Sequence, residues 1–113
     1  MHELRIAEDL SRIVIETAVK GNLSRVTKVN VTFGEMVQIV PEIFEFAFRE
    51  AVRDSVASDA LLGIEMIRVA LKCRECGNEF SLNETLFSCG RCGSYDIEIV
   101  NGKELYVKSI EGE

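Results

Sequence analysis

The chain has 113 residues and a formal net charge of −6, with 47% hydrophobic and 28% charged residues. This length suits one small domain with a satellite module, and the composition is that of a globular protein. The acidic balance argues against nucleic-acid binding, which requires clustered cations. The sequence shows neither a long apolar run nor a signal peptide, so we expect a cytoplasmic protein without a membrane span.

The first part of the chain predicts a helix followed by a strand. Apolar residues recur at helical spacing over residues 3–20, and Gly21 marks the end of this helix. The expected apolar stripe consists of Ile6, Leu10, Ile13, Val14 and Ala18. Apolar and polar residues then alternate over residues 25–33, which predicts a half-buried strand ending before Gly34.

A second helix and three further strands are expected after residue 40. Pro41 is typical of a helix first turn, and the amphipathic pattern continues to about residue 54. Residues 64–71 are rich in apolar and β-branched side chains and predict a strand. Asn101-Gly102 lies between two alternating runs, 97–100 and 105–108, and predicts a β-hairpin. We therefore expect an α+β fold with two helices packed on a small sheet.

Four cysteines form two Cys-x-x-Cys pairs with 12 residues between them, and each pair is followed directly by glycine. The predicted ligands are Cys73, Cys76, Cys89 and Cys92. Two tight turns of this kind direct four sulfurs to one point, and tetrahedral thiolate coordination is what structural zinc prefers. The surrounding segment holds few large apolar side chains, so metal binding would have to supply its folding free energy.

Other uses of these cysteines are less favoured. Two disulfides suit a secreted protein, and a thioredoxin-type pair opens a helix within a βαβ unit. Iron could take the same four ligands, although such sites usually lie in an aromatic core and this chain has no tryptophan. Residues 72–95 hold equal numbers of cations and anions, and a zinc ion with four thiolates adds a charge of about −2. This also argues against phosphate recognition.

His2 is the only histidine of the chain. It could be an idle residue, because chain termini are usually loose. Alternatively, the Met1 amine, the His2 amide and imidazole, and an amide or side-chain oxygen from Glu3 could form adjacent chelate rings. Strong-field nitrogen donors in a plane suit Ni(II) or Cu(II), and the first amides of a helix have no intrahelical acceptor. Such a site would be exposed and easily unloaded, which suits transfer of a metal.

Several motifs together resemble the HypA family of hydrogenase nickel incorporation proteins. They are Met1-His2-Glu3, the amphipathic helix, Phe33-Gly34, Pro41-Glu42, Phe46-Ala47-Phe48, the two Cys-x-x-Cys-Gly knuckles, and Gly102-Lys103-Glu104-Leu105. The resemblance covers nearly the whole chain. Two departures are the absence of histidines beside the zinc cysteines and of a proline in the second knuckle, so histidine-mediated pH sensing at the zinc is not expected here.

The resemblance implies a nickel metallochaperone for [NiFe]-hydrogenase maturation. It implies a nickel-binding α+β domain, residues 1–71 and 96–113, with two helices on a three-stranded mixed sheet, and a zinc-binding domain, residues 72–95. Nickel would be bound by Met1, His2 and Glu3. The implied partners are a HypB-like GTPase and the hydrogenase large-subunit precursor, and some relatives also serve urease. A domain-swapped homodimer is left open.

Two other functions are less favoured. One is a zinc-ribbon adaptor that binds a partner protein and no second metal. The other is an enzyme, which is disfavoured because the lone His2 and four metal-ligating cysteines leave no nucleophile with a general base, and no glycine-rich phosphate loop occurs. Titration with nickel, with and without an N-terminal tag, discriminates the metal carrier from the adaptor.

Overall fold

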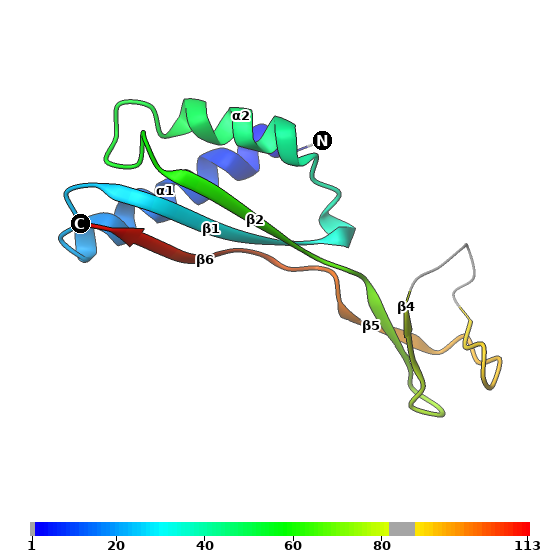
Figure 1. Ribbon diagram of the computed structural model, residues 1–113. Helices are drawn as coiled ribbons and strands as arrows, with labels where there is room; N and C mark the ends of the chain where they lie inside the picture. The colour runs from blue at the N-terminus through cyan, green and yellow to red at the C-terminus, as the bar shows by residue number, and fades with distance from the viewer. Residues whose placement is uncertain (1, 82–87) are drawn as a thin grey trace.

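The computed structural model describes residues 2–81 and 88–113. The molecule is elongated, with principal extents of 55 × 26 × 17 Å. Two helices cover one side of a first sheet, and a second, smaller sheet projects from its end (Figure 1). Neither helix in the described part of the chain has the length and apolar character needed to cross a membrane.

Helix α1 (Glu3–Lys20) has the predicted bounds and ends at Gly21. Its buried side is made by Glu3, Ala7, Leu10, Ser11, Val14 and Ala18. The expected stripe was wrong at Ile13, which is 47% exposed. The buried side is rotated toward Ala7 and Ser11, two small residues that allow close packing of a neighbouring element.

The first sheet is mixed, as the family resemblance implied. It has the order β2-β1-β6 and consists of β1 (Val26–Gly34), β2 (Leu61–Ile67) and β6 (Leu105–Gly112). Strand β1 is central and pairs parallel with β2 and antiparallel with β6. The parallel β1–β2 connection runs through the short 3₁₀ helix η1 (Glu35–Val37) and α2 (Pro41–Ala51). This crossover places α2 on the same side as α1.

The main core lies between this sheet and the two helices. Val29, Val31 and Phe33 alternate along β1 and are buried. Phe33 meets Phe44 of α2 edge to face, with ring centroids 4.8 Å apart. These contacts explain why the predicted alternation in β1 and the helical stripe in α2 meet on one side of the sheet.

The second sheet is antiparallel and has the order β4-β3-β5. Its strands are β3 (Ala70–Cys73), β4 (Glu79–Ser81) and β5 (Ile97–Asn101). The single strand predicted over residues 64–71 is therefore wrong: the chain leaves the first sheet after Ile67 and enters the second at Ala70. The proposed domain boundary at residues 72–95 stays a prediction, and the second sheet takes strands from outside it.

The predicted hairpin at Asn101-Gly102 was also wrong. Strand β5 pairs with β3, and β6 pairs with β1, so the two runs belong to different sheets. Gly102 has a φ of 118° and carries the chain from one sheet to the other. The Asn-Gly signal correctly located a sharp change of direction, but local sequence could not distinguish a hairpin from a crossover between sheets.

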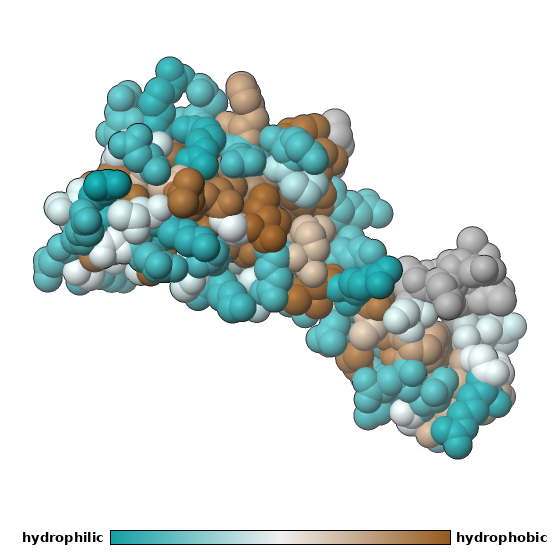
Figure 2. Space-filling view, in the orientation of Figure 1, coloured by the Kyte–Doolittle hydropathy of each residue, from teal (hydrophilic) through white to brown (hydrophobic). Residues whose placement is uncertain are grey.

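The two sheets are joined at a narrow neck (Figure 2). Here the backbones of Gly34 and Gly102 touch, and a Cβ atom added to Gly34 would lie 2.1 Å from the carbonyl carbon of Gly102. Gly34 N–H donates to the carbonyl of Glu104 at 2.7 Å, and Met36 N–H donates to that of Gly102 at 2.8 Å. Only glycine fits at position 34, because any side chain there would overlap the backbone of Gly102.

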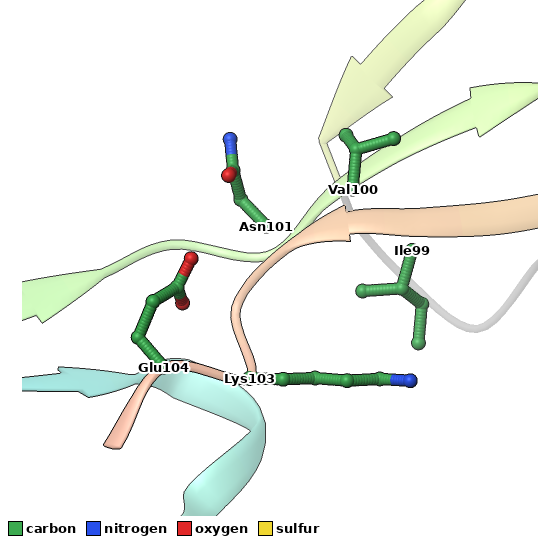
Figure 3. Close-up of a pocket in the computed structure, with 5 residues that line it drawn as sticks. All are labelled: Ile99, Val100, Asn101, Lys103 and Glu104. Atoms are coloured by element: carbon green, nitrogen blue, oxygen red, sulfur yellow. The ribbon is translucent and has the colours of Figure 1, made fainter. Parts of the chain in front are cut away.

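Two linkers pass through this neck, residues 68–69 and residues 102–104, and a carboxylate holds each of them. Glu35 accepts a hydrogen bond from Val69 N–H at 2.9 Å, and Glu104 accepts one from Gly102 N–H at 2.9 Å. Asn101, Lys103 and Glu104 are among the residues that line a pocket of about 310 Å³. Figure 3 shows the Lys103 side chain directed away from those of Glu104 and Asn101. The first linker is thus held by Glu35, directly after β1, and the second is held by a hydrogen bond within the linker itself.

Gly34→Ala is expected to destabilise the whole chain because its methyl group has no room against Gly102. We expect a loss of about 3 kcal/mol in the free energy of unfolding, the upper part of the range for overpacking. Thermal and urea unfolding of the zinc-loaded protein measure it. Gly90→Ala is the control, since a Cβ there meets nothing within 4 Å. Equal stability of the two variants would contradict the close contact at the neck.

Candidate metal centres

The two Cys-x-x-Cys segments form turns of nearly identical geometry. In the first, Gly77 N–H donates to the Cys73 carbonyl at 2.9 Å; in the second, Gly93 N–H donates to the Cys89 carbonyl at 2.8 Å. The two glycines have φ values of 76° and 78°, in the left-handed region that favours glycine. The sequence signal of glycine after each pair is therefore explained by the turn itself.

The turns bring all four predicted sulfur ligands together, within 4.8 Å of one another. Cys73 Sγ lies 3.5 Å from Cys92 Sγ, and Cys76 Sγ lies 3.6 Å from Cys89 Sγ. These separations are far longer than a disulfide bond of about 2.05 Å. They are close to the edge of about 3.8 Å expected for a tetrahedron with metal–sulfur bonds of about 2.3 Å. The group therefore fits a structural zinc site.

Hydrogen bonds to sulfur shift the pKa values of these thiols in opposite directions. The backbone N–H groups of Cys92 and Arg91 lower the pKa of the Cys89 thiol to about 6. The Ser94 N–H lowers the pKa of Cys92, but hydrogen bonds with Cys73 and other thiols, together with burial, outweigh it and raise that pKa to about 12. Without a cation the cluster retains protons, and a bound divalent metal replaces them.

The predicted N-terminal site begins at the start of α1. Met1, whose amine was predicted as a ligand, lies outside the described residues. His2 is exposed and immediately precedes the helix, and its carbonyl accepts the first intrahelical hydrogen bond, from Ile6 N–H at 2.9 Å. The imidazole is thus accessible, and the helix start holds its backbone in place.

Glu3 has a second role that its place in the sequence does not indicate. Its side chain is only 4% exposed, and Oε2 accepts a hydrogen bond from Val40 N–H at 3.0 Å. Val40 precedes α2 and has no cap from its own side chain, so a carboxylate from α1 caps α2. The Val40 N–H, followed by the Glu3 N–H, holds the pKa of this carboxyl below its usual value.

Comparison with known proteins shows which family the chain belongs to. The family model for hydrogenase/urease nickel incorporation, metallochaperone HypA, matches residues 1–112. The chain belongs to the HypA family. HypA proteins of this family serve nickel incorporation for hydrogenase maturation, and this confirms the function predicted from the sequence motifs.

The similarity to HypA relatives extends over whole chains. The hydrogenase maturation factor HypA of Caldanaerobacter subterraneus subsp. tengcongensis is 38% identical, covering 100% of both chains. That of Pyrococcus horikoshii is 34% identical and covers 100% of this chain and 96% of its own. The solution structure of the Ni metallochaperone HypA from Helicobacter pylori has a TM-score of 0.71 and 30% identity, covering 99% of this chain and 97% of that one.

Sequence reasoning missed two groups around the candidate metal centres. Asn78 Nδ2 lies 3.6 Å from Cys89 Sγ and donates to it across the two turns. Its position directly after the first Cys-x-x-Cys-Gly could have suggested this contact. The Val40 N–H that holds Glu3 carried no signal, since the two residues are far apart in the sequence.

Cys76→Ala is expected to abolish metal binding at the cysteines and to unfold residues 73–92, because the metal supplies the folding free energy of this segment. Helix α1 should persist, since its buried side packs in the main core between the helices and the first sheet. Metal analysis and ¹H–¹⁵N spectra measure both effects. Gly90→Ala, whose Cβ would meet nothing within 4 Å, should leave them unchanged. Retention of one zinc per chain in Cys76→Ala would contradict the four-cysteine site.

Glu3→Gln is expected to make the free energy of unfolding depend less steeply on pH in acid. A carboxyl whose folded-state pKa is lowered stabilises the fold above its ordinary pKa of 4.5, and this contribution disappears as the pH falls through the lower folded-state value. The parent should therefore lose stability more steeply than Glu3→Gln below pH 4.5. Urea unfolding followed by helical circular dichroism measures the difference. Parallel pH profiles would show that the Val40 contact does not affect stability.

Proposed function

We propose that this chain binds Ni(II) at its N-terminus through Met1, His2 and Glu3, and transfers it during [NiFe]-hydrogenase maturation. The observation that carries the proposal is the position of His2, exposed and directly before α1. There the imidazole and the adjacent amides are available for chelation, because the first amides of a helix lack intrahelical acceptors. Membership in the HypA family supports nickel as the metal.

The contact of Glu3 with Val40 favours its amide nitrogen over its carboxylate as a nickel donor. The carboxylate is buried and accepts the Val40 N–H, so using it as a ligand would leave that N–H without its acceptor. An amide donor retains the contact and gives a set dominated by nitrogen, which favours planar Ni(II). We therefore assign the amine, the His2 amide and imidazole, and the Glu3 amide as the four donors.

We further propose that Cys73, Cys76, Cys89 and Cys92 hold zinc, and that this zinc is structural. All four coordination positions would be filled by protein, leaving no open position for chemistry or exchange. A non-catalytic role agrees with the metallochaperone family. Iron is the other metal suited to four thiolates, and the absorption spectrum of the purified protein separates them because zinc is colourless.

The zinc-ribbon adaptor without a second metal is the alternative function. Exposed Tyr95, next to the second knuckle, is the observation that favours it, since aromatic side chains are frequent in protein interfaces. An adaptor would bind its partner equally well with an altered N-terminus. A metal carrier would lose its nickel.

The partners proposed are a HypB-like GTPase and the hydrogenase large-subunit precursor. Arg5, Asp9 and Arg12 lie on the exposed side of α1 beside the nickel-binding terminus, and Arg12 is 3.8 Å from Asp9. Arg12→Glu is expected to weaken association with the GTPase, mainly through its rate, because charge complementarity steers docking. Kinetic binding at low salt measures it, with Lys20→Glu at the far end of α1 as the control. An unchanged association rate would exclude this docking position.

His2→Ala is expected to abolish tight nickel binding while leaving stability nearly unchanged, because an exposed terminal side chain contributes little packing energy. Residues added before Met1 should have the same effect, since the amine becomes an amide. Acid should release nickel because every donor must lose a proton to bind. Nickel titration of the untagged, zinc-loaded protein measures all three effects. Equally tight binding by a tagged His2→Ala protein would place nickel elsewhere.

A further inference from the structure

The two edges of the first sheet differ in how they are protected against another strand. The order β2-β1-β6 leaves β2 and β6 as the edge strands. Two register shifts interrupt the pairing of β6 with β1, and β6 carries Lys108 and Glu111. Bulges and charged side chains are common means by which an edge strand resists pairing with a further chain. The β6 edge therefore has such protection.

The β2 edge lacks these features. Strand β2 pairs with β1 without a register shift, and it contains neither proline nor lysine. Among the described residues, none outside this sheet forms a backbone hydrogen bond with β2. Leu61 is 67% exposed and Met66 is 43% exposed, and Figure 2 shows hydrophobic surface along the line that β2 follows in Figure 1. An apolar edge of this kind is a template for a further strand.

Glu65, the only charged residue of β2, is directed away from this edge. Its Oε1 accepts a hydrogen bond from the Thr32 hydroxyl at 3.1 Å and lies 3.5 Å from Lys108 Nζ. Thr32 belongs to the central strand and Lys108 to the opposite edge strand, so the carboxylate is held across the sheet. The one charge on β2 is thus neutralised within the molecule and does not protect the β2 edge.

The sequence of β2 is complementary to a second copy of itself. In an antiparallel pair with a two-fold axis through Ile64, Leu62 lies opposite the second copy's Met66, and Leu61 lies opposite its Ile67. Each of these pairs occurs twice, and the two Ile64 residues face each other at the axis. All of these cross-strand pairs are apolar, and apolar pairs between neighbouring strands stabilise a sheet.

Glu65 and Gly63 favour this register over its neighbours. With the axis at Ile64, Glu65 lies opposite a glycine, so two carboxylates do not face each other. Moving the axis to Glu65 would place like charges directly opposite each other, which is destabilising. Moving it to Gly63 would leave the last two residues of β2 without a partner in the strand.

We propose that β2 is a self-association surface, where a second copy of this chain adds as an antiparallel strand around a two-fold axis at Ile64. The same surface is buried on both copies, as in the commonest class of symmetric dimer. The product is a continuous six-stranded sheet, β6-β1-β2-β2-β1-β6. Because the axis is perpendicular to the sheet, the helices of both copies lie on one side. No residue of either candidate metal centre takes part.

The first test measures association of the full-length, zinc-loaded protein by sedimentation equilibrium. The parent should form a reversible dimer. Leu61→Lys should weaken it by about 10-fold, because two cross-strand pairs are lost together. Val19→Lys is the matched control, since Val19 is 66% exposed on α1, and it should dimerise like the parent. Zinc content and circular dichroism establish that each variant is folded.

Three results of this experiment would overturn the proposal. One is a parent that stays monomeric at millimolar concentration. Another is equal association of Leu61→Lys and the parent. The third is a dimer that exchanges subunits only on unfolding, since this indicates exchanged segments and not a paired edge.

A second test examines the register. Ile67→Glu alone should weaken the dimer as Leu61→Lys does, because it places a charge in an apolar pair. The double variant Leu61→Lys/Ile67→Glu should recover the lost affinity, since each introduced lysine then faces an introduced glutamate of the other copy. The two positions lie at opposite ends of β2, so they cannot pair within one chain. A double variant that associates no better than the weaker single variant would overturn this pairing.

Discussion

The backbone contact between Gly34 and Gly102 is the constraint on which the arrangement of the molecule depends. One glycine ends the central strand of the first sheet, and the other lies on the path from the second sheet back into the first. A Cβ on Gly34 would overlap the backbone of Gly102, so the two chain segments can cross in this way only with glycine at position 34. The crossing determines where both linkers run and allows Glu35 to reach Val69.

The four-cysteine group and the proposed N-terminal nickel site differ in the way that their surroundings hold them. The four cysteines are fixed by paired turns, and Cys73 and Cys89 are buried. His2 is exposed, and only its backbone is held by the helix that follows. A closed set of protein ligands favours permanent retention, whereas an exposed set whose donors compete with protons favours release. The four cysteines are thus suited to retaining a structural metal, and the proposed N-terminal site is suited to exchanging one.

Much of this could be predicted from residue spacing. The periodicities over α1, β1 and α2 are local properties of the sequence. Each Cys-x-x-Cys-Gly segment forms a single turn, so its spacing alone predicts how its two sulfurs are placed. The split of the strand after Ile67 and the crossover at Gly102 could not be predicted, because each depends on which sheet supplies the partner strand. The Glu3–Val40 and Glu35–Val69 contacts each join residues more than 30 positions apart, and no spacing rule relates them.

The cap that Glu3 provides for α2 separates two kinds of constraint on neighbouring residues. Position 3 is needed to join the two helices, whichever metal is present, because Pro41 has no N–H and Val40 offers the first free donor of α2. Position 2 contributes nothing comparable to the fold. A descendant of this protein that abandoned metal delivery could therefore lose its histidine without structural penalty while its glutamate persisted. A glutamate retained alone at position 3 would then indicate the contact between the two helices and would not indicate nickel binding.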